Sequence, residues 1–313
     1  MHAVTIVDGD LAWSEKPDPE PGDTEVLIDV HAAGLNSADL LQRRGLYPAP
    51  AGVVPDVPGL EVAGVVVGVG RRASGVSVGD RVMAVVPGGA QAELVVADAA
   101  CVLPVPAALA WDQAGGFPEA FSTAHDALFT QCGLSMGERV LVTGAAGGVG
   151  TAGVQLAVAA GAEVVASVRA PELRRAVLEL GAAESLDPDE AIGRGPFDVV
   201  LELVGAASFP RALGALAVGG RMAVIGVGSG SRAEIDLLAL MQRRGRIYGS
   251  TLRARTPADK AGVAATVADH VVPLLAAGRL RVPIAAQYPM ERAQEAHARF
   301  AAGGKLGKVV LAR

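Results

Sequence analysis

The fold of this chain is decided by a stretch near its middle, Val140–Leu141–Val142–Thr143–Gly144–Ala145–Ala146–Gly147–Gly148–Val149–Gly150. Four β-favouring residues lead directly into a glycine-rich turn, and an Ala-rich, helix-favouring segment, Thr151 to Ala160, follows at once. Strand, glycine turn and helix in this order form the context that a dinucleotide pyrophosphate site requires. The glycines let the backbone approach phosphate oxygens, and the helix N-terminus behind them carries partial positive charge. The alternative is a tight turn that binds no ligand.

The residues after the turn distinguish between nicotinamide cofactors. A second β-favouring segment, Glu163 to Val168, follows the helical one. In an NAD site, Asp or Glu at the end of this strand, about 20 residues past the glycines, binds the ribose 2′-hydroxyl. This chain has Arg169 there, with Ser167 just before it, and Glu163 lies at the wrong end. An arginine would pair with a 2′-phosphate, so we expect NADPH; the alternative is a solvated surface arginine, since Arg174 and Arg175 lie nearby.

Composition limits the class of protein. The chain has 313 residues, which is long for one core and predicts two domains. A formal charge of −6 argues against a nucleic-acid platform. The chain has two cysteines, Cys101 and Cys132, which are too few for a disulfide framework. No secretory signal is visible near the first residues. We therefore expect a cytoplasmic protein. Val140 to Ala162 lacks charged residues, but its glycine cluster argues against a membrane helix.

The pattern of predicted elements changes along the chain. The first third is rich in short apolar segments separated by Gly and Pro, which is typical of a small barrel-like domain. The strands expected there are Thr24–His31, Glu61–Val69, Asp80–Val86 and Gln91–Val96. Beyond about Ala120, strands alternate with helical segments, which predicts a parallel sheet with helices on both faces. The strands expected there are Arg139–Thr143, Glu163–Val168, Phe197–Leu203, Arg221–Val227 and Arg246–Ser250. A helix at Pro257–Ala277 and a strand at Lys308–Leu311 are expected to close the chain.

Several motifs carry a resemblance to a known family. They are Ala33–Gly34–Leu35–Asn36–Ser37–Ala38–Asp39–Leu40, Gln42–Arg43–Arg44–Gly45–Leu46–Tyr47, Gly59–Leu60–Glu61–Val62–Ala63–Gly64, Pro118–Glu119–Ala120, the glycine turn, Ser250–Thr251–Leu252–Arg253–Ala254–Arg255 and Gly307–Lys308–Val309–Val310–Leu311. With these motifs the chain resembles the zinc-independent quinone oxidoreductases of the medium-chain dehydrogenase/reductase superfamily, and most of all the p53-inducible quinone oxidoreductase type. The resemblance implies an α/β protein with a GroES-like β-barrel domain, residues 1–120 and 255–313. It also implies a Rossmann domain with a doubly wound parallel sheet, residues 121–254, and an active site in a cleft.

The resemblance also implies roles for particular residues. Asn36 would lie near the nicotinamide ribose or the substrate, and Tyr47 would lie in the substrate cleft. The residues implied to touch the cofactor are Asn36, Thr123, Gly147, Gly148, Val149, Val204, Gly205, Ile225, Gly226, Thr251, Leu252 and Lys308, beside Ser167 and Arg169. Family members often carry Lys where this chain has Glu172 and Tyr where it has Asp187–Pro188, so the 2′-phosphate would depend on Arg169 and Ser167. A homodimer, joined edge to edge through Arg221–Val227, is implied as well.

A zinc site is not expected. Zinc-dependent relatives carry a Cys in the segment that here is Asn36–Ser37–Ala38–Asp39, a His where this chain has Leu60, and a lobe of four cysteines that is absent here. Leucine cannot bind a metal.

Without a metal to polarise an isolated carbonyl, the site should favour acceptors that delocalise charge, such as quinones and enones. Such a site mainly has to position the nicotinamide and the acceptor. Asn36 and Tyr47 are the candidate hydrogen-bond donors, although each also has a structural interpretation: Asn36 as a turn residue and Tyr47 as a loop anchor. Two alternatives stay open: a reductase of enoyl thioesters or alkenals, and an NADPH-binding protein without a catalytic role.

Overall fold

The computed structural model describes all residues from Met1 to Arg313 and divides into two units. Unit 1 comprises Met1–Ser122, Leu252–Gly303 and Lys308–Arg313, and unit 2 comprises Thr123–Thr251 and Gly304–Gly307. The sequence prediction assigned all of 255–313 to the first domain. The structure groups Gly304–Gly307 with unit 2, because Gly307 N donates to Ala146 O at 2.8 Å beside the glycine turn.

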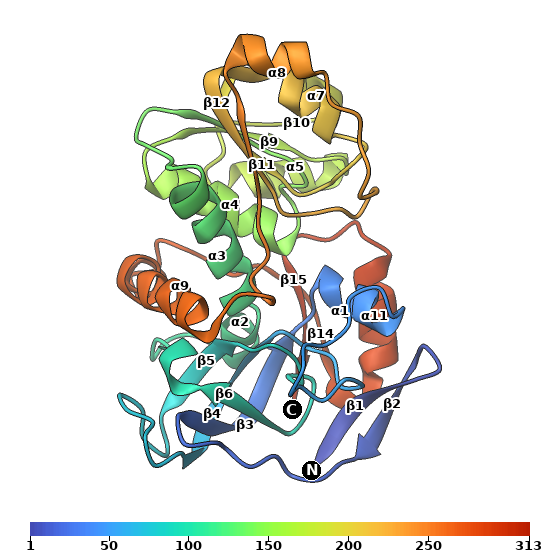
Figure 1. The fold of residues 1–313 in the computed structure, drawn as a ribbon, viewed down its shortest axis with the longest axis vertical. Coiled ribbons are helices and arrows are strands. Elements are labelled where there is room, and N and C mark those ends of the chain that lie inside the picture. The colour runs from blue at the N-terminus through green and yellow to red at the C-terminus, as the bar shows by residue number, and fades with distance from the viewer. The chain divides into compact units, whose positions relative to one another are not determined.

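Unit 2 contains a six-stranded sheet in which every neighbouring pair is parallel (Figure 1). Its strands are β8 (Arg139–Val142), β9 (Glu163–Ser167), β10 (Glu184–Leu186), β11 (Phe197–Glu202), β12 (Leu216–Val224) and β13 (Arg246–Gly249). The connecting helices are α4 (Gly148–Ala159), α5 (Pro171–Leu178), α6 (Pro188–Gly193), α7 (Phe209–Gly214) and α8 (Leu237–Arg243). The spatial order β10-β9-β8-β11-β12-β13 reverses direction between β8 and β11. This is the doubly wound dinucleotide-binding order, so the predicted fold class is confirmed for this unit.

The position of β12 corrects one prediction. The sequence interpretation ended this strand at Val227 and used it as a free edge for dimer formation. In the structure β12 ends at Val224 and is bonded to β11 on one side and to β13 on the other. A strand with two partners has no unpaired backbone groups left for a third. The free edge on this side of the sheet belongs to β13.

Unit 1 is built on a largely antiparallel sheet in the order β14-β15-β3-β4-β5-β7, with β6 also paired to β3. Its strands are β3 (Glu25–Gly34), β4 (Glu61–Val69), β5 (Arg81–Val85), β6 (Leu94–Asp98), β7 (Val102–Pro104), β14 (Ile284–Pro289) and β15 (Lys308–Ala312). The C-terminal strand β15 pairs antiparallel with β3, so the two ends of the chain complete one sheet (Figure 1). This sheet agrees with the barrel-like domain expected from the short, punctuated strands.

Helices and a hairpin complete unit 1. They are the hairpin β1 (His2–Val7) and β2 (Asp10–Glu15) and the helices α1 (Ser37–Arg43), α2 (Trp111–Gly115), α9 (Pro257–His270), α10 (Val272–Ala276) and α11 (Ala293–Ala301). Helix α3 (Pro118–His125) contains the boundary between the units, and a π-helix (Asp126–Gln131) follows it.

The single helix predicted at Pro257–Ala277 is broken into α9 and α10. Pro273 has no N–H for the carbonyl four residues earlier, and its ring crowds that carbonyl.

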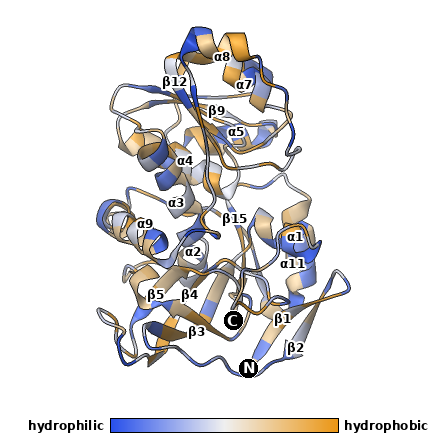
Figure 2. Cartoon of the chain, viewed as in Figure 1, coloured by the Kyte–Doolittle hydropathy of each residue, from blue (hydrophilic) through white to orange (hydrophobic).

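Each unit has its own apolar core. In unit 1 the core lies between the sheet and the helices, with fully buried residues such as Ile28, Val62 and Val309. In unit 2 the largest buried side chains of the core include Leu141, Phe197 and Met222. Figure 2 shows the apolar strands of both sheets. No helix combines the length and the apolar character needed to cross a bilayer.

Candidate functional site

The glycine turn of unit 2 connects β8 to α4 as the sequence predicts. Gly144 has a φ of +59°, which a residue with a side chain rarely adopts. A Cβ on Gly150 would lie 2.4 Å from Gly144 O, and one on Gly153 would lie 2.5 Å from Leu201 Cδ2. The turn and the helix therefore pack against the sheet more closely than residues with side chains would allow.

The N-terminus of α4 offers free hydrogen-bond donors. Gly147 is the N-cap residue and has no side chain that caps the helix. The amides of Gly148 and Val149 stand in the first turn, where no intrahelical acceptor exists. These residues are half-exposed, so a ligand can reach them. Backbone donors and the helix dipole make this N-terminus suited to bind a phosphate group.

The end of β9 is basic. Ser167 is buried, and its carbonyl accepts from Ala145 N at 3.1 Å, which brings the strand end beside the glycine turn. Arg169 is exposed and has no ion-pair or hydrogen-bond partner. Arg174 donates to Val168 O at 3.1 Å and pairs with Asp187 at 3.3 Å, so a second guanidinium lies at the same strand end. No carboxylate occupies the position of the usual ribose ligand; Asp187 belongs to the next strand connection and is held by Arg174.

Glu202, at the end of β11, organises the predicted residues on the other side of the switch point. Its Oε1 accepts from Val204 N and Gly205 N, both at 2.8 Å, and its main-chain carbonyl accepts from Ile225 N at 2.9 Å and Gly226 N at 3.1 Å. Four predicted cofactor residues are thus held by one fully buried residue that sequence reasoning missed. The available signal was an acid directly after the apolar run Val199–Val200–Leu201. Glu202 Oε2 is buried without a partner.

In unit 1, Asn36 caps helix α1. Asn36 N donates to Asp39 Oδ2 at 2.7 Å, and Asp39 Oδ1 accepts from Gly59 N at 3.0 Å. Burial raises the pKa of Asp39 to about 6, although the hydrogen bond from Asn36 N opposes the shift. Asp39 therefore joins α1 to the start of β4.

The Asn36 side chain is held at both ends by a buried ion pair. Its Nδ2 donates to Glu61 Oε1 at 3.0 Å, and its Oδ1 accepts from Lys308 Nζ at 2.7 Å. Lys308 Nζ also contacts Glu61 Oε1 at 2.5 Å and Leu35 O at 2.7 Å. All three donors of the ammonium are used inside unit 1, and the Asn36 amide has a fixed orientation.

Glu119 is a second acid near this ion pair. Its amide donates to Glu61 Oε2 at 2.9 Å, and its half-buried carboxyl has no hydrogen-bond partner. Burial, reinforced by the Glu61 carboxylate, raises the pKa of Glu119 to about 8. Both causes favour the protonated, uncharged form of this carboxyl. The sequence motif Pro118–Glu119–Ala120 by itself did not predict the contact with Glu61.

Tyr47 follows α1 in a loop that Arg253 holds in place. Arg253 donates to Tyr47 O at 3.1 Å, Gln42 Oε1 at 2.8 Å and Pro87 O at 2.7 Å, and its guanidinium lies 5.1 Å from the centroid of the Tyr47 ring. The Tyr47 ring is half-buried, and burial raises the pKa of its hydroxyl above the usual value. Arg253 itself was part of a recognised motif, but its role as an anchor was not predicted.

The remaining predicted residues lie at the boundaries of the units. Thr123 is the first residue of unit 2 and is buried, Thr251 is exposed at the end of the main segment of that unit, and Leu252 is buried where the chain re-enters unit 1. The structure thus brings Asn36 and Lys308 together in unit 1. It brings the glycine turn, Ser167 and the Glu202-held loops together in unit 2.

Comparisons with known proteins agree with this architecture. Residues 22–107 match the family model described as alcohol dehydrogenase GroES-like domain, and residues 161–311 match the one described as zinc-binding dehydrogenase. A human quinone oxidoreductase is 34% identical over 94% of this chain and 90% of its own length. The chain belongs to the quinone oxidoreductase family of the medium-chain dehydrogenase/reductase superfamily.

Solved structures of similar proteins have the same fold as this quinone oxidoreductase family member. A mycobacterial protein in complex with NADPH has a TM-score of 0.89 and 28% identity, with full coverage of both chains. A quinone oxidoreductase from Pseudomonas syringae has a TM-score of 0.88 and 30% identity, again with full coverage of both chains. The predicted combination of a GroES-like domain with a Rossmann domain is therefore confirmed.

Proposed function

We propose that the protein is an NADPH-dependent reductase that transfers hydride to quinones or other conjugated carbonyl compounds. The observation that carries the proposal is the pairing of free amides at the start of α4 with a basic end of β9. Family membership supports it, because the curated relative is a quinone oxidoreductase and one similar structure was solved with NADPH. Unit 2 would bind the cofactor, and unit 1 would bind the substrate.

The residues of unit 2 fit NADPH. Gly148 and Val149 would hold the pyrophosphate with their main-chain donors, beside Gly147, whose amide donates to Gly144 O within the turn. Arg169, Arg174 and Ser167 would hold the 2′-phosphate. Loops 204–205 and 225–226, fixed by Glu202, would line the site together with Thr123, Thr251 and Leu252. When bound, NADPH supplies the hydride, and the acceptor must take it at a carbon conjugated to an oxygen.

The residues of unit 1 would receive and orient the acceptor. Tyr47, held by Arg253, offers a ring that can stack on a quinone and a hydroxyl that can donate to a developing oxyanion. Asn36, oriented by Glu61 and Lys308, would position the nicotinamide ribose or the acceptor. Lys308 would act through Asn36, since the three donors of its ammonium are already occupied.

We propose that this chemistry needs no zinc. Leu60 has no ligand atom, and Glu61 already neutralises Lys308. No group of three or more His, Cys, Asp or Glu side chains is arranged to hold a metal ion. The donor set therefore does not fit a zinc site of the dehydrogenase type.

We also propose a cytoplasmic homodimer. The β13 edge is unpaired, and three apolar side chains of the preceding helix, α8, are exposed: Leu237 at 66%, Leu238 at 62% and Met241 at 71%. An exposed apolar patch next to a free strand edge is typical of an interface. Light scattering of the protein and of Leu238→Glu should give a dimer and a monomer, respectively; a monomeric parent protein would refute the proposal.

A kinetic experiment tests the cofactor and the substrate together. The purified protein is assayed with NADPH or NADH against a panel of ortho- and para-quinones and against a crotonyl thioester. We expect turnover of quinones with NADPH. In Arg169→Gln the KM for NADPH should rise about tenfold, the loss of one charge-assisted contact, while the KM for NADH stays unchanged.

Arg175→Gln is the matched control for this experiment. Arg175 is exposed on α5 and pairs with Glu179 on the same helix, so its loss changes the net charge equally without touching the end of β9. A preference for NADH would refute the cofactor assignment. Turnover of the thioester alone would make the protein an enoyl reductase, and tight NADPH binding without reduction of any acceptor would favour a non-catalytic role.

A further inference from the structure

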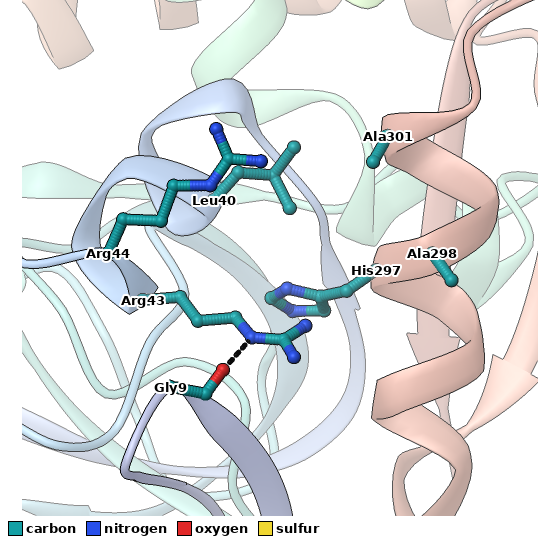
Figure 3. A pocket seen from close by; sticks show the side chains of 7 residues that line it. All are labelled: Gly9, Leu40, Arg43, Arg44, His297, Ala298 and Ala301. Carbon is teal, nitrogen blue, oxygen red and sulfur yellow. Dashed lines mark hydrogen bonds between the residues drawn. The ribbon is translucent and has the colours of Figure 1, made fainter.

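Unit 1 contains a pocket that none of the proposed functional residues lines. Its volume is about 360 Å³, and it lies between the C-terminal end of α1, the tip of the β1–β2 hairpin and one face of α11. Figure 3 shows the side chains that line it: Gly9, Leu40, Arg43, Arg44, His297, Ala298 and Ala301. The volume is within the range of small-molecule sites.

Two guanidinium groups border this pocket. Arg43 donates through Nε to Gly9 O and through Nη2 to Asp10 Oδ1 at 3.1 Å, which leaves Nη1 without a partner. Arg44 is exposed, and its side chain has no hydrogen-bond or ion-pair partner. Asp10 pairs with Arg43 alone, so the two arginines together retain an excess of positive charge.

His297 provides an unsatisfied polar atom at the wall of the same pocket. The residue is fully buried, and its ring extends from α11 toward Arg43 (Figure 3). Its Nε2 lies 3.0 Å from Gln91 Oε1, and its Nδ1 has no partner. With Gln91 Oε1 as acceptor, Nε2 carries the proton and Nδ1 offers a lone pair. A buried polar atom without a partner costs about 1–3 kcal/mol, which a bound group can recover.

We propose that this pocket binds a phosphate group, either inorganic phosphate or the phosphate of a small monoester. Guanidinium groups bind phosphate oxygens with several parallel hydrogen bonds. A protonated phosphate oxygen can also donate to His297 Nδ1, which a fully ionised anion such as sulfate cannot do. Leu40, Ala298 and Ala301 provide an apolar wall that suits a short organic group. Since α1 carries Asn36 at its other end, an occupied pocket would brace the helix that bears a predicted site residue.

The test uses calorimetric titration of the full chain with inorganic phosphate, phenyl phosphate and sulfate, each at constant ionic strength. The dinucleotide site also binds phosphate, so Arg169→Gln serves as the background in which that contribution is reduced. We expect phosphate to bind this background protein. Arg44→Gln, added to it, should weaken binding about tenfold, as expected for the loss of one charge-assisted hydrogen bond.

Arg279→Gln is the matched control. Arg279 is exposed in unit 1 and has no side-chain partner, so its loss changes the charge equally but should leave phosphate binding unchanged. The Nδ1 resonance of His297 in ¹⁵N NMR should also shift on addition of phosphate and not of sulfate. This readout does not depend on a variant that must fold.

Each outcome decides the proposal. Stronger binding of phenyl phosphate than of inorganic phosphate supports a monoester, and equal binding supports the free ion. If Arg44→Gln does not weaken phosphate binding, the proposed site is wrong. It is also wrong if sulfate and phosphate bind equally and the Nδ1 resonance of His297 does not shift. Failure of the reductase assay would leave this result untouched, because the pocket shares no residue with the proposed site.

Discussion

Lys308 and Glu61 form a buried ion pair in which the ammonium and Oε1 are 2.5 Å apart, although the two residues come from opposite ends of the chain. The pair joins β15 to β4 and orients Asn36. Removing one member leaves the other charged and buried, so Lys308→Met should lower the free energy of unfolding by about 3–5 kcal/mol. Urea denaturation measures this change.

The control for Lys308→Met is Arg71→Met, because Arg71 pairs with Asp23 on the surface with its side chain 88% exposed. That change should cost less than about 1 kcal/mol. The double variant Glu61→Gln with Lys308→Met should recover part of the loss. Equal stability of the single and double variants would contradict a coupled pair.

Replacing Arg253 should weaken the binding of quinone more than the binding of NADPH. Arg253→Lys loses the planar fork that reaches Gln42, Tyr47 and Pro87 together. We expect a loss of about 2 kcal/mol in the free energy of unfolding and, with quinone as acceptor, a larger rise in the KM for quinone than in that for NADPH. Steady-state kinetics with each substrate varied in turn measures this split. Equal effects on both KM values would mean that Arg253 serves the fold alone.

The raised pKa of Glu119 should make the stability of the fold depend on pH. Its pKa is raised from 4.5 to about 8 in the folded state, so the folded protein binds more protons than the unfolded chain between these values. The stability contributed by the protonated carboxyl is therefore complete at low pH and is lost as pH rises toward 8. Glu119→Gln should flatten this slope when denaturation is measured at several pH values. An unchanged slope would show that another group is responsible.

Gly150 should not tolerate a side chain. A Cβ there would lie 2.4 Å from Gly144 O, so Gly150→Ala should cost about 1–3 kcal/mol and weaken dinucleotide binding, because the turn must move. Gly262→Ala is the control: nothing lies within 4 Å of its Cβ in α9, and the change should stabilise the helix by up to about 1 kcal/mol. Thermal unfolding measures the stability of both variants, and nucleotide titration measures their dinucleotide binding.

Sequence reasoning found the elements that have strong local signals. The strand, glycine turn and α4 follow from residues within a few positions of one another. The β1–β2 hairpin was missed although Asp8–Gly9, both with positive φ, is a typical two-residue turn. Gln91–Val96 was placed too early, because β6 begins at Leu94, where pairing with β3 decides its limits.

The sequence by itself determined the order of the elements, the doubly wound half of the fold and the basic residue after β9, because backbone propensity and side-chain charge are local properties. Only the tertiary structure decided which strand has a free edge, that Glu202 holds two loops at once, and that Lys308 reaches Glu61 and Asn36. These relationships join residues that are far apart in the chain. Their energies come from desolvation and hydrogen-bond geometry, and neither exists before the sheets have formed.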